Sequence, residues 1–119
     1  MANLTELAQG SVGDRLRAMR EQTDESARGL AGLAGLARSH VGLIENGTVD
    51  NPSGSTVLAL ARVLGCTAGW LLNGEGRPPS GKRVREAVAD AKGASADAYA
   101  VRRGVVTTVG AGRRVAVGQ

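Results

Sequence analysis

The residues best suited to chemistry lie in one short stretch, Ala37 to Asn46, with the sequence ARSHVGLIEN. A helix that steps at 100° per residue places one set of side chains on a common side, namely Ala37, Val41, Ile44 and Glu45. Its opposite side carries Arg38, Ser39, Gly42, Leu43 and Asn46. An Arg fork can bond N7 and O6 of guanine, and an apolar side chain can contact a thymine methyl. This stretch is therefore predicted to be a helix anchored by one face and able to read base edges with the other.

The preceding residues must hold this helix in place. Ser26 is a good N-cap for a short helix, because its hydroxyl can accept from free backbone donors. The apolar residues of that helix are Leu30, Leu33 and Ala34. Gly35 then supplies the positive φ that a sharp helix-to-helix turn needs, and Leu36 fills the corner. The sequence thus predicts two short helices joined by a tight turn between Ser26 and Gly47.

Further helices are predicted on both sides of this pair. The first runs from Ser11 to about Gln22 and has an apolar stripe of Val12, Leu16 and Met19. Ser53 and Thr67 can cap two later helices, and Gly65 ends the first of them. The core-like residues of these two helices are Val57, Leu58, Leu60, Ala61, Leu64, Trp70, Leu71 and Leu72.

The ordered set ARGLAGLAGLARSHVGLIENG, VGDRLRAMR, LALARVLGC and WLLNG resembles the Cro and phage-repressor (XRE-type) family of helix-turn-helix transcription regulators. The resemblance covers about Ser11 to Gly74. It implies an all-α, five-helix, repressor-like domain, followed here by a basic C-terminal extension. It also implies binding of a palindromic DNA operator in the major groove by a homodimer, because one such helix spans only a few base pairs. Repression is the expected regulatory effect.

The resemblance also assigns roles to individual residues. Base edges would be read by Arg38, Ser39 and Leu43, with Gly42 allowing close approach of the groove. The DNA backbone would be contacted by Arg15, Arg17, Ser26, Arg28, His40 and Asn46. Each of these side chains also has a simpler interpretation as solvated surface. Glu45 lies at the edge of the inward face, where an unpaired carboxylate is costly, and similar family members pair it with the position of Arg20.

Charge is distributed unevenly along the 119 residues, whose formal net charge is +4. Residues 1–73 contain 6 Arg and no Lys against 7 acidic residues, whereas residues 74–119 contain 9 Lys and Arg against 4. Bulk charge alone therefore does not indicate nucleic-acid binding by the first part. Cys66 is the single cysteine, which rules out an intramolecular disulfide and suits a reducing compartment. With no apolar run of about 20 residues, we expect a cytoplasmic, nucleoid-associated protein without a membrane span.

Composition predicts four segments. These are an N-terminal arm (1–10), the helix-turn-helix domain (11–74), a Gly- and Pro-rich linker (75–81) and the basic extension (82–119). The extension is expected to begin with a helix from Lys82 to Lys92, continue with a helical or irregular piece from Ala94 to Arg103, and end in a β-hairpin, VVTTV-GAG-RRVAV. That hairpin is either ordered against a second subunit or disordered. The dimer surface would be this extension or the helix around Trp70 to Leu72.

Enzyme chemistry finds little support in the sequence. The stretch GRPPSGKR, Gly76 to Arg83, nearly matches the phosphate-binding loop G-x-x-x-x-G-K-[ST], but Arg83 stands where a magnesium-binding hydroxyl belongs and no strand precedes it. With one His, one Cys and no clustered acids, we predict no catalytic residues, no metal site and no cofactor. The remaining alternative is a protein-interaction module, such as an antitoxin or the partner of a regulator, with weak DNA binding. Leu43, Gly42 and the acidic balance of residues 1–73 favour that alternative.

Overall fold

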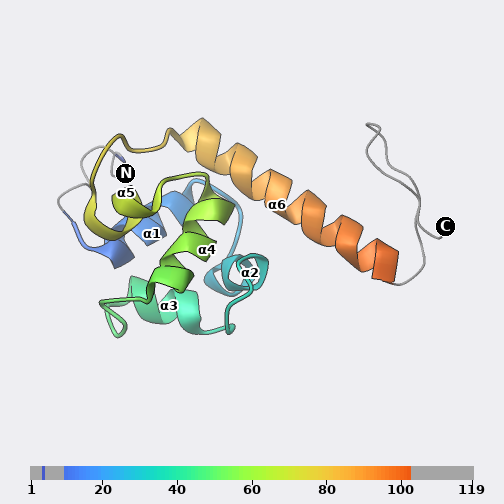
Figure 1. Cartoon of the computed structure of the whole chain (residues 1–119), viewed down its shortest axis with the longest axis horizontal. Coiled ribbons are helices and arrows are strands. Elements are labelled where there is room, and N and C mark those ends of the chain that lie inside the picture. Colours follow the sequence, from blue (N-terminus) through green and yellow to red (C-terminus); the bar gives the residue numbers. More distant parts are fainter. Residues whose placement is uncertain (1–3, 5–9, 103–119) are drawn as a thin grey trace.

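The computed structural model describes Leu4 and residues 10–102, with side chains described through residue 94. In this part of the chain there are six helices and no strand. They are α1 (Val12–Glu21), α2 (Ala27–Leu33), α3 (His40–Glu45), α4 (Gly54–Leu64), α5 (Ala68–Asn73) and α6 (Gly81–Arg102). Helices α1 to α5 form a compact group, and the far end of α6 projects beyond it (Figure 1).

Local hydrogen bonds set the starts of α2, α4 and α5 where the sequence predicts them. The hydroxyls of Ser26, Ser53 and Thr67 accept from the backbone N–H three residues later, at 2.9, 3.2 and 3.1 Å. Gly65 closes α4 in the left-handed region with φ of 74°. Such caps satisfy backbone groups that a helix leaves unpaired at its ends. The predicted capping residues are confirmed.

A single apolar core joins all six helices. Its largest fully buried residues, each at most 2% exposed, are Leu16, Met19, Leu30, Val41, Ile44, Val57, Leu60, Leu64, Trp70, Leu71 and Val84. The prediction that Leu58 belongs to the core is wrong, because its side chain is 53% exposed. The buried stripe of α4 follows positions i, i+3, i+4 and i+7 from Val57, and Leu58 is rotated 100° away from Val57.

Helix α6 is longer and more integrated than the sequence predicts. Instead of a helix to Lys92 followed by a second piece, one continuous helix runs to Arg102. Val84 and Val88 are 0% and 3% exposed, and α6 packs on α4 and α2. Its first half therefore completes the same core as α1 to α5. The predicted hairpin lies outside the described residues.

Cys66 lies between α4 and α5 and packs against the core. Burial raises the pKa of its thiol from about 9.0 to about 11. The folded chain thus holds this proton more tightly than the unfolded chain. The contribution of the protonated thiol to the free energy of unfolding is therefore complete below pH 9 and is lost as pH rises toward 11. We expect the free energy of unfolding to fall over this interval by more in the parent chain than in Cys66→Ala, measured by urea unfolding at stepped pH. Parallel pH profiles for the two proteins would contradict this.

Candidate nucleic-acid interface

The turn between α2 and α3 is closed by backbone hydrogen bonds. Gly35 has φ of 73°, and the N–H of Leu36 donates to the carbonyl of Ala31 at 2.8 Å. This bond reaches back across the helix end, as in a Schellman motif, and Leu36 packs against the core beside it. The predicted positive φ at Gly35 is confirmed. The turn fixes the direction in which the chain enters α3.

Helix α3 begins at His40, three residues later than predicted. Arg38 and Ser39 form a turn in which the N–H of His40 donates to the carbonyl of Ala37 at 2.9 Å. Ala37 is exposed, so its predicted place on the anchored face is wrong. Helical stepping does not apply to a residue that precedes the helix.

The two faces of α3 are separated as predicted from His40 onward. Val41 and Ile44 are 0% and 1% exposed, whereas the Leu43 side chain is 36% exposed. Arg38 and Ser39 are exposed in the turn that leads into the helix. A Cβ added at Gly42 would meet nothing within 4 Å, so this position faces open space. The four residues predicted to read bases are therefore all accessible from outside.

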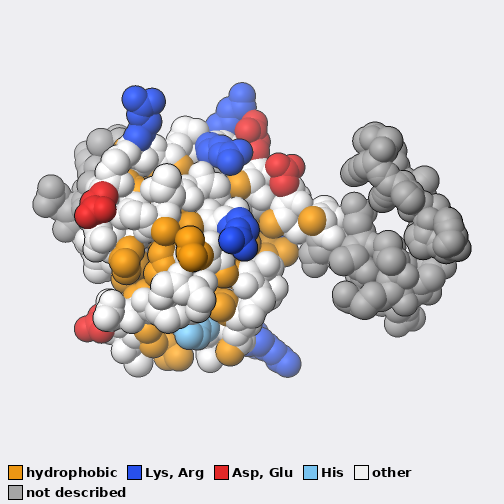
Figure 2. All heavy atoms as spheres, in the orientation of Figure 1, with side chains coloured by type: hydrophobic (Ala, Val, Ile, Leu, Met, Phe, Trp, Pro, Cys, Tyr) orange, Lys and Arg blue, Asp and Glu red, His pale blue; other side chains and the backbone are white. Residues whose placement is uncertain are grey.

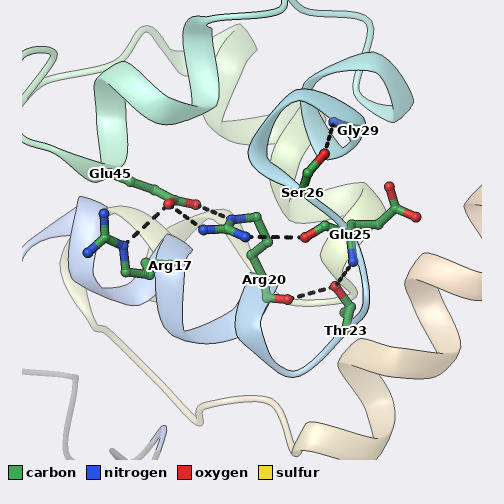
Figure 3. Close-up of polar contacts among 7 residues, drawn as sticks. All are labelled: Arg17, Arg20, Thr23, Glu25, Ser26, Gly29 and Glu45. Atoms are coloured by element: carbon green, nitrogen blue, oxygen red, sulfur yellow. Dashed lines mark hydrogen bonds and ion pairs between the residues drawn. The ribbon is translucent and has the colours of Figure 1, made fainter.

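An ion pair between Arg20 and Glu45 connects α1 to α3. The Glu45 side chain is 3% exposed and accepts from Arg20 Nε at 2.7 Å and from Arg20 Nη2 at 2.9 Å (Figure 3). The hydrogen bond to Glu45 raises the pKa of Arg20. Arg20 also donates to the carbonyl of Glu25 at 3.2 Å, which connects α1 to the segment before α2. The two residues expected to pair are thus joined by a bidentate contact.

Gly13 allows α1 and α3 to come close, and sequence reasoning missed it. A Cβ at this position would overlap the carbonyl oxygen of Ile44 and lie 3.1 Å from that of Glu45. A side chain here would push the two helices apart. A Gly inside an otherwise apolar and charged amphipathic helix was the available signal.

Most residues predicted to contact phosphates surround the exposed face. Arg28 is exposed and lines a shallow hollow of about 210 Å³ together with Arg38 and Ser39. The Arg17 side chain is 54% exposed and reaches Glu45 at 3.4 Å. Ser26 and Asn46 are exposed, and His40 is half-buried at the start of α3. The Asn46 side-chain oxygen accepts from the Thr48 N–H at 2.9 Å, and its amide NH₂ is a further donor on an exposed residue.

Arg15 is the exception, because it is 2% exposed. Its Nε and Nη2 donate to the carbonyls of Leu71 and Leu72 at 2.8 and 2.7 Å, and Nη1 donates to the carbonyl of Gly10. Desolvation lowers the pKa of Arg15, although a guanidinium stays charged at neutral pH. Its predicted role at the DNA backbone is corrected to a structural one, because it satisfies carbonyls at the end of α5.

Comparison with known proteins gives one match. Residues 11–69 match the family described as helix-turn-helix domain, and no curated protein or solved structure matches the chain. Within the described ranges, no helix combines the length and apolar character needed to cross a membrane, and no group of three or more potential metal ligands occurs. Residues 11–69 are therefore a helix-turn-helix domain, a type of domain that suggests a DNA-binding regulator.

Proposed function

We propose that this protein is a sequence-specific DNA-binding transcriptional regulator that inserts α3 into the major groove of an operator. The observation that carries the proposal is the separation of buried from exposed residues in α3 and in the turn that precedes it. Val41 and Ile44 are buried, whereas Leu43 is exposed on α3 and Arg38 and Ser39 are exposed in the turn before it. A major groove admits one helix and displays a distinct pattern for each base pair.

The surrounding side chains suit contacts to the DNA backbone. Arg28 shares the hollow beside Arg38, and Arg17 and Asn46 are both exposed next to Glu45. Phosphate contacts of this kind fix orientation without reading sequence. They also compensate locally for the acidic balance of residues 1–73.

A homodimer is proposed because one helix reads too few base pairs to select an operator. Two copies related by a two-fold axis would read half-sites about one helical turn apart, hence a palindrome. Trp70 and Leu71 are both 0% exposed within the subunit and Leu72 is half-buried, so the helix around Trp70 to Leu72 offers little apolar surface to a second copy. The extension from α6 onward remains the proposed contact. Repression would follow from occupancy of a promoter.

Arg38→Ala tests this function. On a duplex obtained by selection from random sequences, we expect affinity to fall about 10- to 100-fold, because a bidentate guanine contact contributes about 1 to 3 kcal/mol of discrimination. Binding to a scrambled duplex should change far less. Arg62→Ala is the matched control, because Arg62 is an exposed arginine near the C-terminal end of α4. It should bind both duplexes like the parent chain. Binding is measured by fluorescence anisotropy across several salt concentrations.

Equal losses on selected and scrambled duplexes would reduce Arg38 to a phosphate contact and contradict base reading.

A second candidate function, a protein-interaction module, is favoured by one observation. Hydrophobic side chains gather over α4 on the face in Figure 2, and Leu58 and Leu43 are 53% and 36% exposed. If this module were the main function, selection from random duplexes would enrich no motif.

A further inference from the structure

Three arginines converge on a hollow at the junction of α4 and α5, away from α3. The hollow has a volume of about 430 Å³, and its lining includes Arg62, Arg77, Arg83, Gly65, Thr67 and Pro79. Arg62 comes from α4, Arg77 from the segment before α6, and Arg83 from the first turn of α6. Separate elements of the chain therefore supply the three guanidinium groups.

Among the described residues, no ion pair neutralises these three guanidinium groups, although Asp90 lines a neighbouring hollow together with Arg62 and Arg83. The ion pairs found within the described part of the chain use Arg17, Arg20, Lys82 and Lys92, and none uses Arg62, Arg77 or Arg83. Glu86, three residues after Arg83 in α6, pairs with Lys82 at 3.9 Å and does not line the hollow. Like charges gathered at one concave site repel one another and attract anions.

The local backbone holds two of the arginines in position. A Cβ at Gly65 would lie 3.1 Å from Arg83 Nε, so the guanidinium of Arg83 packs directly over the left-handed end of α4. The Ser80 hydroxyl accepts from the Arg83 N–H at 3.0 Å and caps the start of α6. Arg77 is followed by two prolines, which restrict φ and stiffen the segment that carries it. The backbone that carries Arg77 and Arg83 is therefore ordered by these local features, while the exposed guanidinium groups remain accessible to a ligand.

We propose that this hollow, named here the arginine hollow, binds a compact oxyanion with two or more negative charges. The planar fork of Arg matches the paired oxygens of phosphate and carboxylate groups, and three forks favour an anion with several such oxygens. The hydroxyl of Thr67 accepts from the Trp70 N–H at 3.1 Å and retains its own proton to donate. The segment from Gly76 to Arg83 is thus an anion-binding segment through its arginines, without the strand and hydroxyl of a phosphate-binding loop.

The arginine hollow lies at the far end of α4 from α3, so a ligand in it need not be the duplex proposed to bind α3. Helix α4 starts beside α3 and ends at α5 and the start of α6 (Figure 1). Its 11 residues span about 16 Å at 1.5 Å per residue. The proposed anion is therefore a separate small ligand, and its binding does not depend on whether α3 reads DNA.

Calorimetric titration of the full chain with inorganic pyrophosphate and, separately, with citrate tests the proposal. We expect saturable one-to-one binding of one or both anions at 0.15 M salt, and the stronger of the two identifies phosphate or carboxylate as the preferred group. Arg62→Ala, Arg77→Ala and Arg83→Ala should each weaken it about tenfold or more, because charge-assisted hydrogen bonds are lost. Trp70, the single tryptophan, provides a fluorescence readout one helical turn from Thr67.

Arg85→Ala is the matched control, since Arg85 is an exposed arginine of the same helix that does not line the arginine hollow. It should bind like the parent chain. Circular dichroism checks that each variant is folded, and Arg77→Ala, which lies outside any helix, keeps the test valid if Arg83→Ala unfolds. Absence of saturable binding by both anions would overturn the proposal. An equal loss in Arg85→Ala would also overturn it, because that result indicates diffuse charge attraction.

Discussion

An Arg15→Met variant is expected to lose about 3 kcal/mol of unfolding free energy, although a basic residue in a DNA-binding domain suggests a surface role. Arg15 is 2% exposed and donates to the carbonyls of Leu71, Leu72 and Gly10. Met occupies a similar volume but carries no donor. The two carbonyls at the end of α5 would then lack their charged partner, and a buried acceptor without a partner is costly. Urea unfolding monitored by Trp70 fluorescence measures the loss.

Arg15→Lys separates charge from geometry. Lys keeps the positive charge but has a single ammonium group. This group cannot contact the carbonyls of α5 and of Gly10 at the same time, as the planar guanidinium of Arg15 does. We expect it to recover less than half of the lost free energy. A fully stable Arg15→Met variant with weakened DNA binding would instead return Arg15 to the phosphate contacts.

The second large effect is expected at the ion pair between α1 and α3. Arg20→Met should cost about 3 kcal/mol, because Glu45 is 3% exposed and would keep a buried charge without its bidentate partner. Arg17, whose Nε lies 3.4 Å from Glu45, would compensate in part. Since the pair also fixes α3 against α1, affinity for a selected duplex should fall in the same variant. Chemical unfolding and anisotropy measure the two effects.

Arg17→Met is the matched control, because Arg17 contacts the same carboxylate from a side chain that is 54% exposed. Exposed pairs contribute little, so its loss should be under about 1 kcal/mol. Adding Glu45→Gln to Arg20→Met removes the uncompensated charge and should recover much of the stability, which a double-mutant cycle quantifies. Equal costs for Arg17→Met and Arg20→Met would show that the bidentate contact does not govern this interface.

Prediction of the exposed face of α3 from sequence succeeded where helical spacing applied. Val41 and Ile44 are buried and Leu43 is exposed, as a 100° step requires. Ala37 was misplaced because the chain forms a turn before His40. Leu58 was misplaced because apolar character does not reveal whether a neighbouring element covers a side chain.

The amino-acid sequence by itself determined the start of α2, the end of α4 and the tight turn, since Ser26, Gly65 and Gly35 act through hydrogen bonds and φ angles within a few residues. Only the tertiary structure decided which charges are internal. Arg15 and Arg17 are two residues apart on α1 and therefore point in nearly opposite directions, one to the end of α5 and the other mostly to solvent. Both residues are Arg, so residue type does not explain why only Arg15 is buried. The difference depends on the carbonyl of Leu71, which is 56 residues from Arg15 in the chain.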